Sequence, residues 1–150
     1  MLTISEVKRI ATSAENLKHR LMIEFAYTAG LRVSELVAVK VQHLNLEKLK
    51  MFVPGIGKLG ARTTIFSAGL KDALQRQIGN KGPDDYLFPS ERGGNLTTRS
   101  VTKFFKAALQ TSGVDKEVTP HSLRQSFTAF MLAKGNDKAS VQSLLGRRAL

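Results

Sequence analysis

The residues best suited to chemistry are basic side chains in three separate segments, each with a glycine, a proline or a carboxylate close by. In residues 28–35 (TAGLRVSE), Arg32 lies at the entry of an expected helix, and Glu35 follows three positions later. A guanidinium in this position can donate a planar pair of hydrogen bonds to a phosphate, while the carboxylate orients it or the neighbouring backbone. A surface arginine beside a helix-capping glutamate would give the same pattern.

The segment 119–124 (TPHSLR) combines a histidine with an arginine at the start of another expected helix. Pro120 favours a helix start, and His121 and Arg124 are three positions apart, so both side chains project from one face of the first turns. A phosphate bound there would meet a proton-transfer group and a bidentate cation together. The structural alternative is a capping histidine beside a solvated arginine.

A third segment, residues 57–62 (GKLGAR), is expected at the tip of a β-hairpin. Lys58 has a flexible stem that could reach into a nucleic acid and deliver a proton to a leaving oxygen. Exposed hairpins often carry lysine for other reasons, so this segment by itself is a weak signal.

The charge balance of the chain indicates a polyanionic partner. Lysine and arginine total 23 against 12 acidic residues, which gives a formal charge of +11 over 150 residues. Each phosphate that a basic side chain neutralises releases condensed counterions, which favours binding to nucleic acid. The absence of cysteine excludes disulfides and thiolate metal sites and fits a reducing compartment. The apolar stretches are too short for a membrane span.

The elements that must position these side chains are expected to be mainly helical. Apolar residues recur at helical spacing, and Thr3 with Glu6 predicts a capping box at the first helix. Two apolar runs around a glycine-rich turn predict a hairpin. The expected helices cover about residues 3–11, 14–29, 34–39, 70–78, 97–112, 122–134 and 137–145, and the expected strands cover 49–53 and 62–66. The expected fold class is mainly α with a small antiparallel β-hairpin (α+β), in a single domain over residues 1–150.

Taken in order, the three segments resemble motifs of the tyrosine recombinase (phage integrase) family, and the resemblance covers nearly the whole chain. The family's first arginine motif is similar to residues 28–35, its hairpin lysine to Lys58, and its His-x-x-Arg motif to residues 121–124. Two further stretches are similar, namely residues 86–90 (YLFPS) with the glycines at 93 and 94, and residues 141–146 (VQSLLG). The resemblance implies the fold of this family's catalytic domain.

The resemblance also implies a reaction in which a tyrosine attacks the scissile phosphate, forms a 3′-phosphotyrosyl bond and frees a 5′-hydroxyl, without a metal or another cofactor. Arg32 and Arg124 would clamp the non-bridging oxygens, and Lys58 would protonate the leaving oxygen. The expected catalytic residues are Arg32, Lys58, His121, Arg124 and Arg147, with Glu35 in support, and the expected DNA-binding residues are Arg62, Arg99, Lys103 and Arg148.

Three departures from the family pattern affect this expectation. The family usually has histidine where this chain has Arg147, and a guanidinium can donate to a phosphate but does not readily act as a general acid or base. The hairpin turn is shorter than the pattern, and Ala61 stands where a second lysine is common. The family's nucleophilic tyrosine follows the Leu-Gly pair, whereas this sequence ends at Leu150. Because Tyr27 and Tyr86 are expected to be structural aromatics, the 150-residue fragment is expected to be inactive.

Double-stranded DNA is the expected partner. The full-length family member is expected to act as a homo-tetramer on DNA, whereas this fragment is expected to be monomeric and to lack the family's N-terminal DNA-binding domain. We expect a cytoplasmic, nucleoid-associated protein of a prokaryote, phage or mobile element, with no membrane contact. The alternatives are a non-catalytic DNA-binding module from a decayed integrase and a ribosomal or RNA-binding protein. A tyrosine encoded shortly after residue 150 would favour the enzyme.

Overall fold

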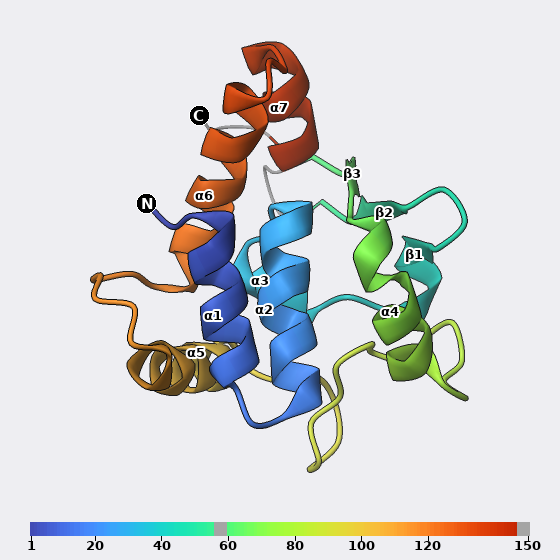
Figure 1. Ribbon diagram of the computed structural model, residues 1–150. Coiled ribbons are helices and arrows are strands. Elements are labelled where there is room, and N and C mark those ends of the chain that lie inside the picture. Colours follow the sequence, from blue (N-terminus) through green and yellow to red (C-terminus); the bar gives the residue numbers. More distant parts are fainter. Residues whose placement is uncertain (56–59, 147–150) are drawn as a thin grey trace.

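The computed structural model describes residues 1–55 and 60–146, and this part of the chain is mainly helical with one small sheet (Figure 1). The α-helices are α1 Ile4–Ser13, α2 Leu17–Ala29, α3 Val33–Val37, α4 Lys71–Ile78, α5 Thr98–Ser112, α6 Pro120–Ala133 and α7 Lys138–Leu145. The antiparallel strands β1 Leu44–Asn45, β2 Lys50–Val53 and β3 Arg62–Ile65 form a sheet in the order β1-β2-β3, flanked by the 3₁₀ turns η1 Val41–His43 and η2 Ala68–Leu70. The prediction of a mainly α fold with a small antiparallel hairpin is confirmed.

The first two helices begin where polar side chains satisfy free backbone N–H groups. The hydroxyl oxygen of Thr3 accepts from the N–H of Glu6 at 3.1 Å, and the Glu6 carboxylate accepts from the N–H of Thr3 at 2.9 Å, so the predicted capping box is confirmed. Asn16 caps α2 by accepting from the N–H of Lys18 at 2.8 Å. The two capped helices, α1 and α2, pack side by side (Figure 1).

Helix α2 is the centre of the core, because α1, α5 and α6 all pack against it. Phe25 of α2 is fully buried, and its ring centroid lies 5.9 Å from that of Phe66 and 6.2 Å from that of Phe88. Leu87 and Phe88 are also fully buried. Residues 86–88 therefore anchor the long connection between α4 and α5 to the core, as their apolar character predicts.

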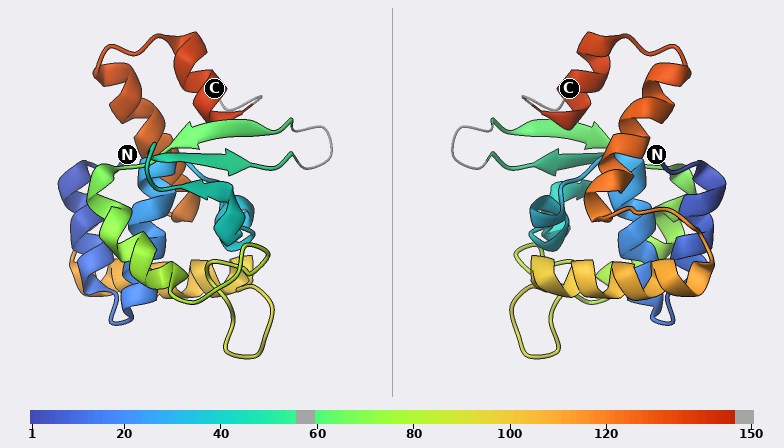
Figure 2. Two further views of the ribbon diagram at one scale, coloured as in Figure 1. Left: turned by 90° about the vertical axis from the view of Figure 1, so that its right-hand side faces the viewer. Right: turned by 90° about the vertical axis from the view of Figure 1, so that its left-hand side faces the viewer.

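Strands β2 and β3 extend away from the helices, and α7 lies over them (Figure 2). Val53 pairs with Arg62 and Met51 with Thr64, and the side chains of Met51, Val53 and Thr64 are buried. Because side chains alternate along a strand, Arg62 shares the inward face with Thr64. Strand β1 was not predicted, since two residues are too few to show an alternating pattern.

Gly30 ends α2 at the point where α2 approaches α6 and α7. Its φ of +64° is in the left-handed region that favours glycine. A Cβ atom at this position would lie 2.7 Å from side-chain atoms of both Phe127 and Leu145. Backbone conformation and close packing therefore both require glycine at the position where the end of α2 meets Phe127 of α6 and Leu145 of α7.

We expect Gly30→Ala to lower the free energy of unfolding by about 2–4 kcal/mol, because left-handed strain adds to overpacking. Gly94→Ala is the matched control, since Gly94 has a φ of +69° but a Cβ atom there would meet no heavy atom within 4 Å. Strain alone should cost about 1–2 kcal/mol at that position. Urea denaturation of both variants measures the difference in the free energy of unfolding. Equal losses of stability would show that overpacking around Gly30 does not contribute.

Candidate phosphate-binding site

Three segments that are far apart in the sequence meet around one carboxylate. Glu35 belongs to α3, Arg32 directly precedes α3, Arg62 begins β3, and Arg124 lies in α6. We call these four residues the arginine cluster. The left-handed Gly30 turns the chain from α2 into α3, where the backbone N–H of Arg32 donates to the Glu35 carboxylate at 2.8 Å.

Glu35 is the acceptor that joins the three arginines. Arg62 makes the closest contact, with Nη1 2.6 Å from Oε2 and Nη2 2.8 Å from Oε1, so the pair is bidentate. Arg32 Nη1 donates to Oε2 at 3.2 Å, and Arg124 Nη1 lies 3.9 Å from Oε1. Three guanidinium groups thus share one carboxylate, which leaves an excess of positive charge in the cluster.

Arg124 is held by backbone carbonyls from two other elements. Its Nη1 donates to the carbonyl of Gly30 at 2.6 Å, and its Nη2 donates to the carbonyl of Leu145 at 2.6 Å. A guanidinium carries five N–H donors in a fixed plane, so these two contacts determine the orientation of the whole group. The end of α2 and the end of α7 therefore set where Arg124 points.

The pKa values in the cluster show that its charges are mutually dependent. Burial of the Glu35 carboxyl acts to raise its pKa, but the hydrogen bonds from the Arg62 side chain and the Arg32 backbone, with the charges of both arginines, outweigh burial and lower it. Burial, followed by repulsion from Arg32 and Arg62, lowers the pKa of Arg124 to about 10, while Glu35 opposes this shift. Arg124 consequently stays charged at neutral pH, and an additional anion would relieve the repulsion.

Exposure differs within the cluster. The Arg32 side chain is 24% exposed, whereas those of Arg62 and Arg124 are 6% and 4% exposed. Arg62 was expected to bind DNA, but its Nε donates to the carbonyl of Leu144 at 2.7 Å and both Nη atoms bind Glu35. These contacts hold Arg62 against Glu35 and the end of α7, with its side chain buried. The alternation of β3, in which Arg62 shares the face of a buried threonine, is the sequence signal that could have identified this burial.

His121 lies in the first turn of α6, three residues before Arg124, and its side chain is exposed. The helix begins at Pro120, slightly earlier than expected, because the hydroxyl of Ser122 accepts from the N–H of Thr119 at 3.0 Å. The start of α6 therefore carries the histidine at the surface and the arginine in the interior.

Arg99 and Lys103, two of the expected DNA-binding residues, are exposed on α5 and one helical turn apart. Helix α5 packs against α3, which carries Glu35. Three other predicted site residues, Lys58, Arg147 and Arg148, lie outside the described residues.

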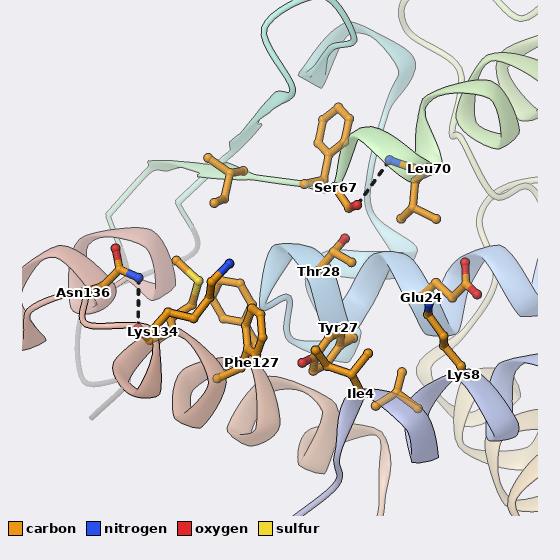
Figure 3. Close-up of a pocket in the computed structure, with 16 residues that line it drawn as sticks. Ile4, Lys8, Glu24, Tyr27, Thr28, Ser67, Leu70, Phe127, Lys134 and Asn136 are labelled. Carbon is orange, nitrogen blue, oxygen red and sulfur yellow. Dashed lines mark hydrogen bonds between the residues drawn. The ribbon is translucent and has the colours of Figure 1, made fainter.

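Tyr27 of α2 lines an open, mostly apolar pocket between α1, α2, α6 and the segment that follows β3 (Figure 3). It is 7% exposed, and its ring centroid lies 6.4 Å from that of Phe130. Burial raises the pKa of the Tyr27 phenol, which is the opposite of what a nucleophilic phenolate needs. The described lining residues include no member of the arginine cluster. The surroundings of Tyr27 are thus those of a structural aromatic.

Within residues 1–55 and 60–146, no group of three or more histidine, aspartate and glutamate side chains is arranged to hold a metal ion. No helix in the same two ranges is long and apolar enough to cross a membrane.

The sequence matches the family model described as "Phage integrase family" over residues 1–149. Tyrosine recombinase XerD of Listeria innocua is 34% identical over 160 aligned residues, which cover 97% of this chain and 53% of the relative. Tyrosine recombinase XerA of Pyrococcus horikoshii is 38% identical over 154 aligned residues, which cover 99% of this chain and 53% of the relative. The chain spans about half the length of these curated relatives.

Solved structures of recombinases have the same fold. A crystal structure of XerA recombinase matches with a TM-score of 0.86 at 27% identity, covering 98% of this chain and 56% of that chain. Lambda integrase, residues 75–356 bound to DNA, matches with a TM-score of 0.77 at 25% identity, covering 99% of this chain and 56% of that chain. Together with the family match over nearly the entire sequence, these similarities show that the chain belongs to the phage integrase family of tyrosine recombinases.

Proposed function

We propose that this chain is the catalytic domain of a site-specific DNA recombinase, in which the arginine cluster binds the scissile phosphate and strands are cleaved and rejoined through a 3′-phosphotyrosyl intermediate. The observation that supports this most strongly is the meeting of Arg32 and Arg124 at one carboxylate. Nothing in local periodicity requires two arginines from such distant segments to meet. A phosphate site does require it, because both must act on the same group.

In this proposal, Arg32 and Arg124 neutralise the charge that develops on the phosphate oxygens, and Glu35 keeps the two guanidinium groups in position. His121 assists proton transfer and hydrogen bonding at the phosphate, Lys58 protonates the leaving 5′-oxygen, and Arg147 adds a further donor. The exposed Arg99 and Lys103 contact the DNA backbone, as does Arg148. The complete recombinase assembles as a homo-tetramer on double-stranded DNA in the cytoplasm, and no cofactor takes part.

We expect the 150-residue chain to bind duplex DNA with an affinity that falls steeply between low and moderate salt. The reason is its charge of +11, because each neutralised phosphate releases counterions. Arg99→Gln and Lys103→Gln should each reduce the slope of log affinity against log salt by about 1. Fluorescence anisotropy with several duplex sequences measures both effects, with Arg76→Gln on α4 as the control. Affinity that is insensitive to salt would contradict binding along the phosphate backbone.

The proposed reaction is tested by trapping the covalent intermediate. The protein encoded by the uninterrupted reading frame is first footprinted to locate its binding site and then incubated with a nicked duplex of that site, on which strand loss prevents religation. We expect a denaturation-resistant protein–DNA adduct through a tyrosine that is neither Tyr27 nor Tyr86, so the 150-residue chain alone should form none. Specific binding without any adduct would favour the alternative of a non-catalytic DNA-binding module.

A further inference from the structure

We propose that Arg62 is a positioning residue: it holds Glu35 and the end of α7 in one fixed arrangement, so that Arg32 and Arg124 face the same phosphate. The inference rests on the proposed function, because it assigns to that phosphate site a residue that acts through its neighbours. It replaces the expectation that Arg62 binds DNA directly.

Arg62 and Glu35 form a bidentate pair in the interior of the protein. Both carboxylate oxygens accept from Arg62, at 2.6 and 2.8 Å, and both side chains are 6% exposed. A bidentate pair fixes the plane of the carboxylate, whereas a single contact leaves it free to rotate. Since Oε2 also accepts from Arg32 Nη1 and Oε1 from the Arg32 backbone, the plane set by Arg62 determines where the Arg32 guanidinium lies.

Arg62 also contacts the C-terminal end of α7. Arg62 Nε donates to the carbonyl of Leu144 at 2.7 Å, and Arg124 Nη2 donates to the next carbonyl, that of Leu145, at 2.6 Å. Carbonyls at the C-terminus of a helix lack helical partners and carry the negative end of the helix dipole, so they attract cations. Two guanidinium groups thereby hold successive carbonyls of α7. Arg62 thus fixes the element that also orients Arg124.

The packing around Arg62 leaves little freedom for another arrangement. A Cβ atom at Gly146 would lie 3.1 Å from Arg62 Cδ and 3.3 Å from Nη1, so the glycine allows the Arg62 side chain to lie against the backbone. With three directed donors engaged and its side chain 6% exposed, Arg62 has the environment of a structural support rather than of a surface ligand.

The conservative substitution Arg62→Lys separates positioning from charge. Lysine keeps the positive charge but replaces the planar fork by a single ammonium group, which cannot satisfy both carboxylate oxygens and the Leu144 carbonyl in the same geometry. If Arg62 acted only through its charge, lysine would preserve phosphate binding. If it positions Glu35 and α7, lysine would not.

The experiment is a titration of the 150-residue chain with inorganic phosphate, in which NMR monitors the arginine Nε–H signals. The temperature is chosen so that all variants are folded. For Arg62→Lys we expect phosphate affinity to fall about tenfold, while the salt dependence of DNA binding stays unchanged. Arg76→Lys on α4 is the control and should not alter phosphate affinity. Wild-type phosphate affinity in the folded Arg62→Lys variant would overturn the inference and leave the proposed function standing.

A second measurement needs no variant and remains decisive if Arg62→Lys fails to fold. In the wild-type chain, phosphate should shift the signals of Arg32 and Arg124, whereas the Arg62 Nε–H, bonded to the Leu144 carbonyl, should keep its shift and its slow exchange with solvent. A phosphate-induced shift of Arg62 larger than that of Arg32 would show direct contact and overturn the inference. No phosphate response at Arg32 or Arg124 would instead refute the proposed phosphate site itself.

Discussion

Replacing Arg124 by lysine is expected to slow the proposed DNA strand cleavage by about 100- to 1,000-fold, measured in the protein that the uninterrupted reading frame encodes. The guanidinium of Arg124 is oriented by the carbonyls of Gly30 and Leu145 and lies 3.9 Å from Glu35. A lysine ammonium cannot satisfy both carbonyls and still present a planar pair of donors to a phosphate. Single-turnover cleavage of a nicked duplex measures the rate directly.

The controls for this prediction separate catalysis from binding. Arg76→Lys, on the exposed face of α4, has the same change in chemistry and should cleave at the wild-type rate. Because Arg124 is assigned to the transition state, the maximal rate should fall much more than the affinity for DNA. A variant that cleaves at the wild-type rate once saturated with DNA would contradict the assignment.

Glu35→Gln is expected to lower the free energy of unfolding of the 150-residue chain by about 3–5 kcal/mol, the usual cost of removing one partner from a buried ionic network. The amide offers one acceptor oxygen in place of two and no charge, so three clustered guanidinium groups lose their shared counterion. Glu47→Gln, at an exposed position, should change stability little. Urea denaturation measures both, and added phosphate or sulfate should restore part of the loss if the cluster binds oxyanions.

The same network predicts a pH dependence whose sign follows from Glu35. Its pKa in the folded protein is lowered from the ordinary value of 4.5, so its stabilising contribution is fully present above about pH 4.5 and is lost as the pH falls through the lower folded value. Between these pH values the wild-type chain should lose stability faster than Glu35→Gln. Parallel pH profiles for the two proteins would show that Glu35 does not titrate as described.

The parts of the site that could be predicted from the sequence are those with local signals. The spacing of Arg32 and Glu35 at a helix entry predicts their association, and the structure shows the contact between Glu35 and the Arg32 backbone. The spacing of His121 and Arg124 after a proline places them at a helix start, and they do share the first turns of α6. Such features depend on neighbours three or four residues away, for which helix geometry alone is sufficient.

The parts that could not be predicted depend on contacts between distant segments. The role of Arg62 requires knowing that β3 passes beside α3 and beneath α7, and the 4-residue strand alone does not contain that information. The carbonyls of Gly30 and Leu145 orient Arg124, but the sequence cannot show which carbonyls do so, because every residue has one. The short strand β1 falls below the length at which alternation can be read.

The separation in sequence between the partners of Arg124 and Arg62 also limits when the site can exist during synthesis of the protein. The Arg124–Gly30 contact spans 94 residues, and the Arg62–Leu144 contact spans 82. Helices such as α1 and α2 can form soon after they leave the ribosome, because their contacts are local. The arginine cluster, in contrast, needs the carbonyls of Leu144 and Leu145, so a nascent chain that ends before α7 lacks the contacts that hold Arg62 and Arg124 in place. The contacts that orient Arg62 and Arg124 are therefore formed only when α7 docks.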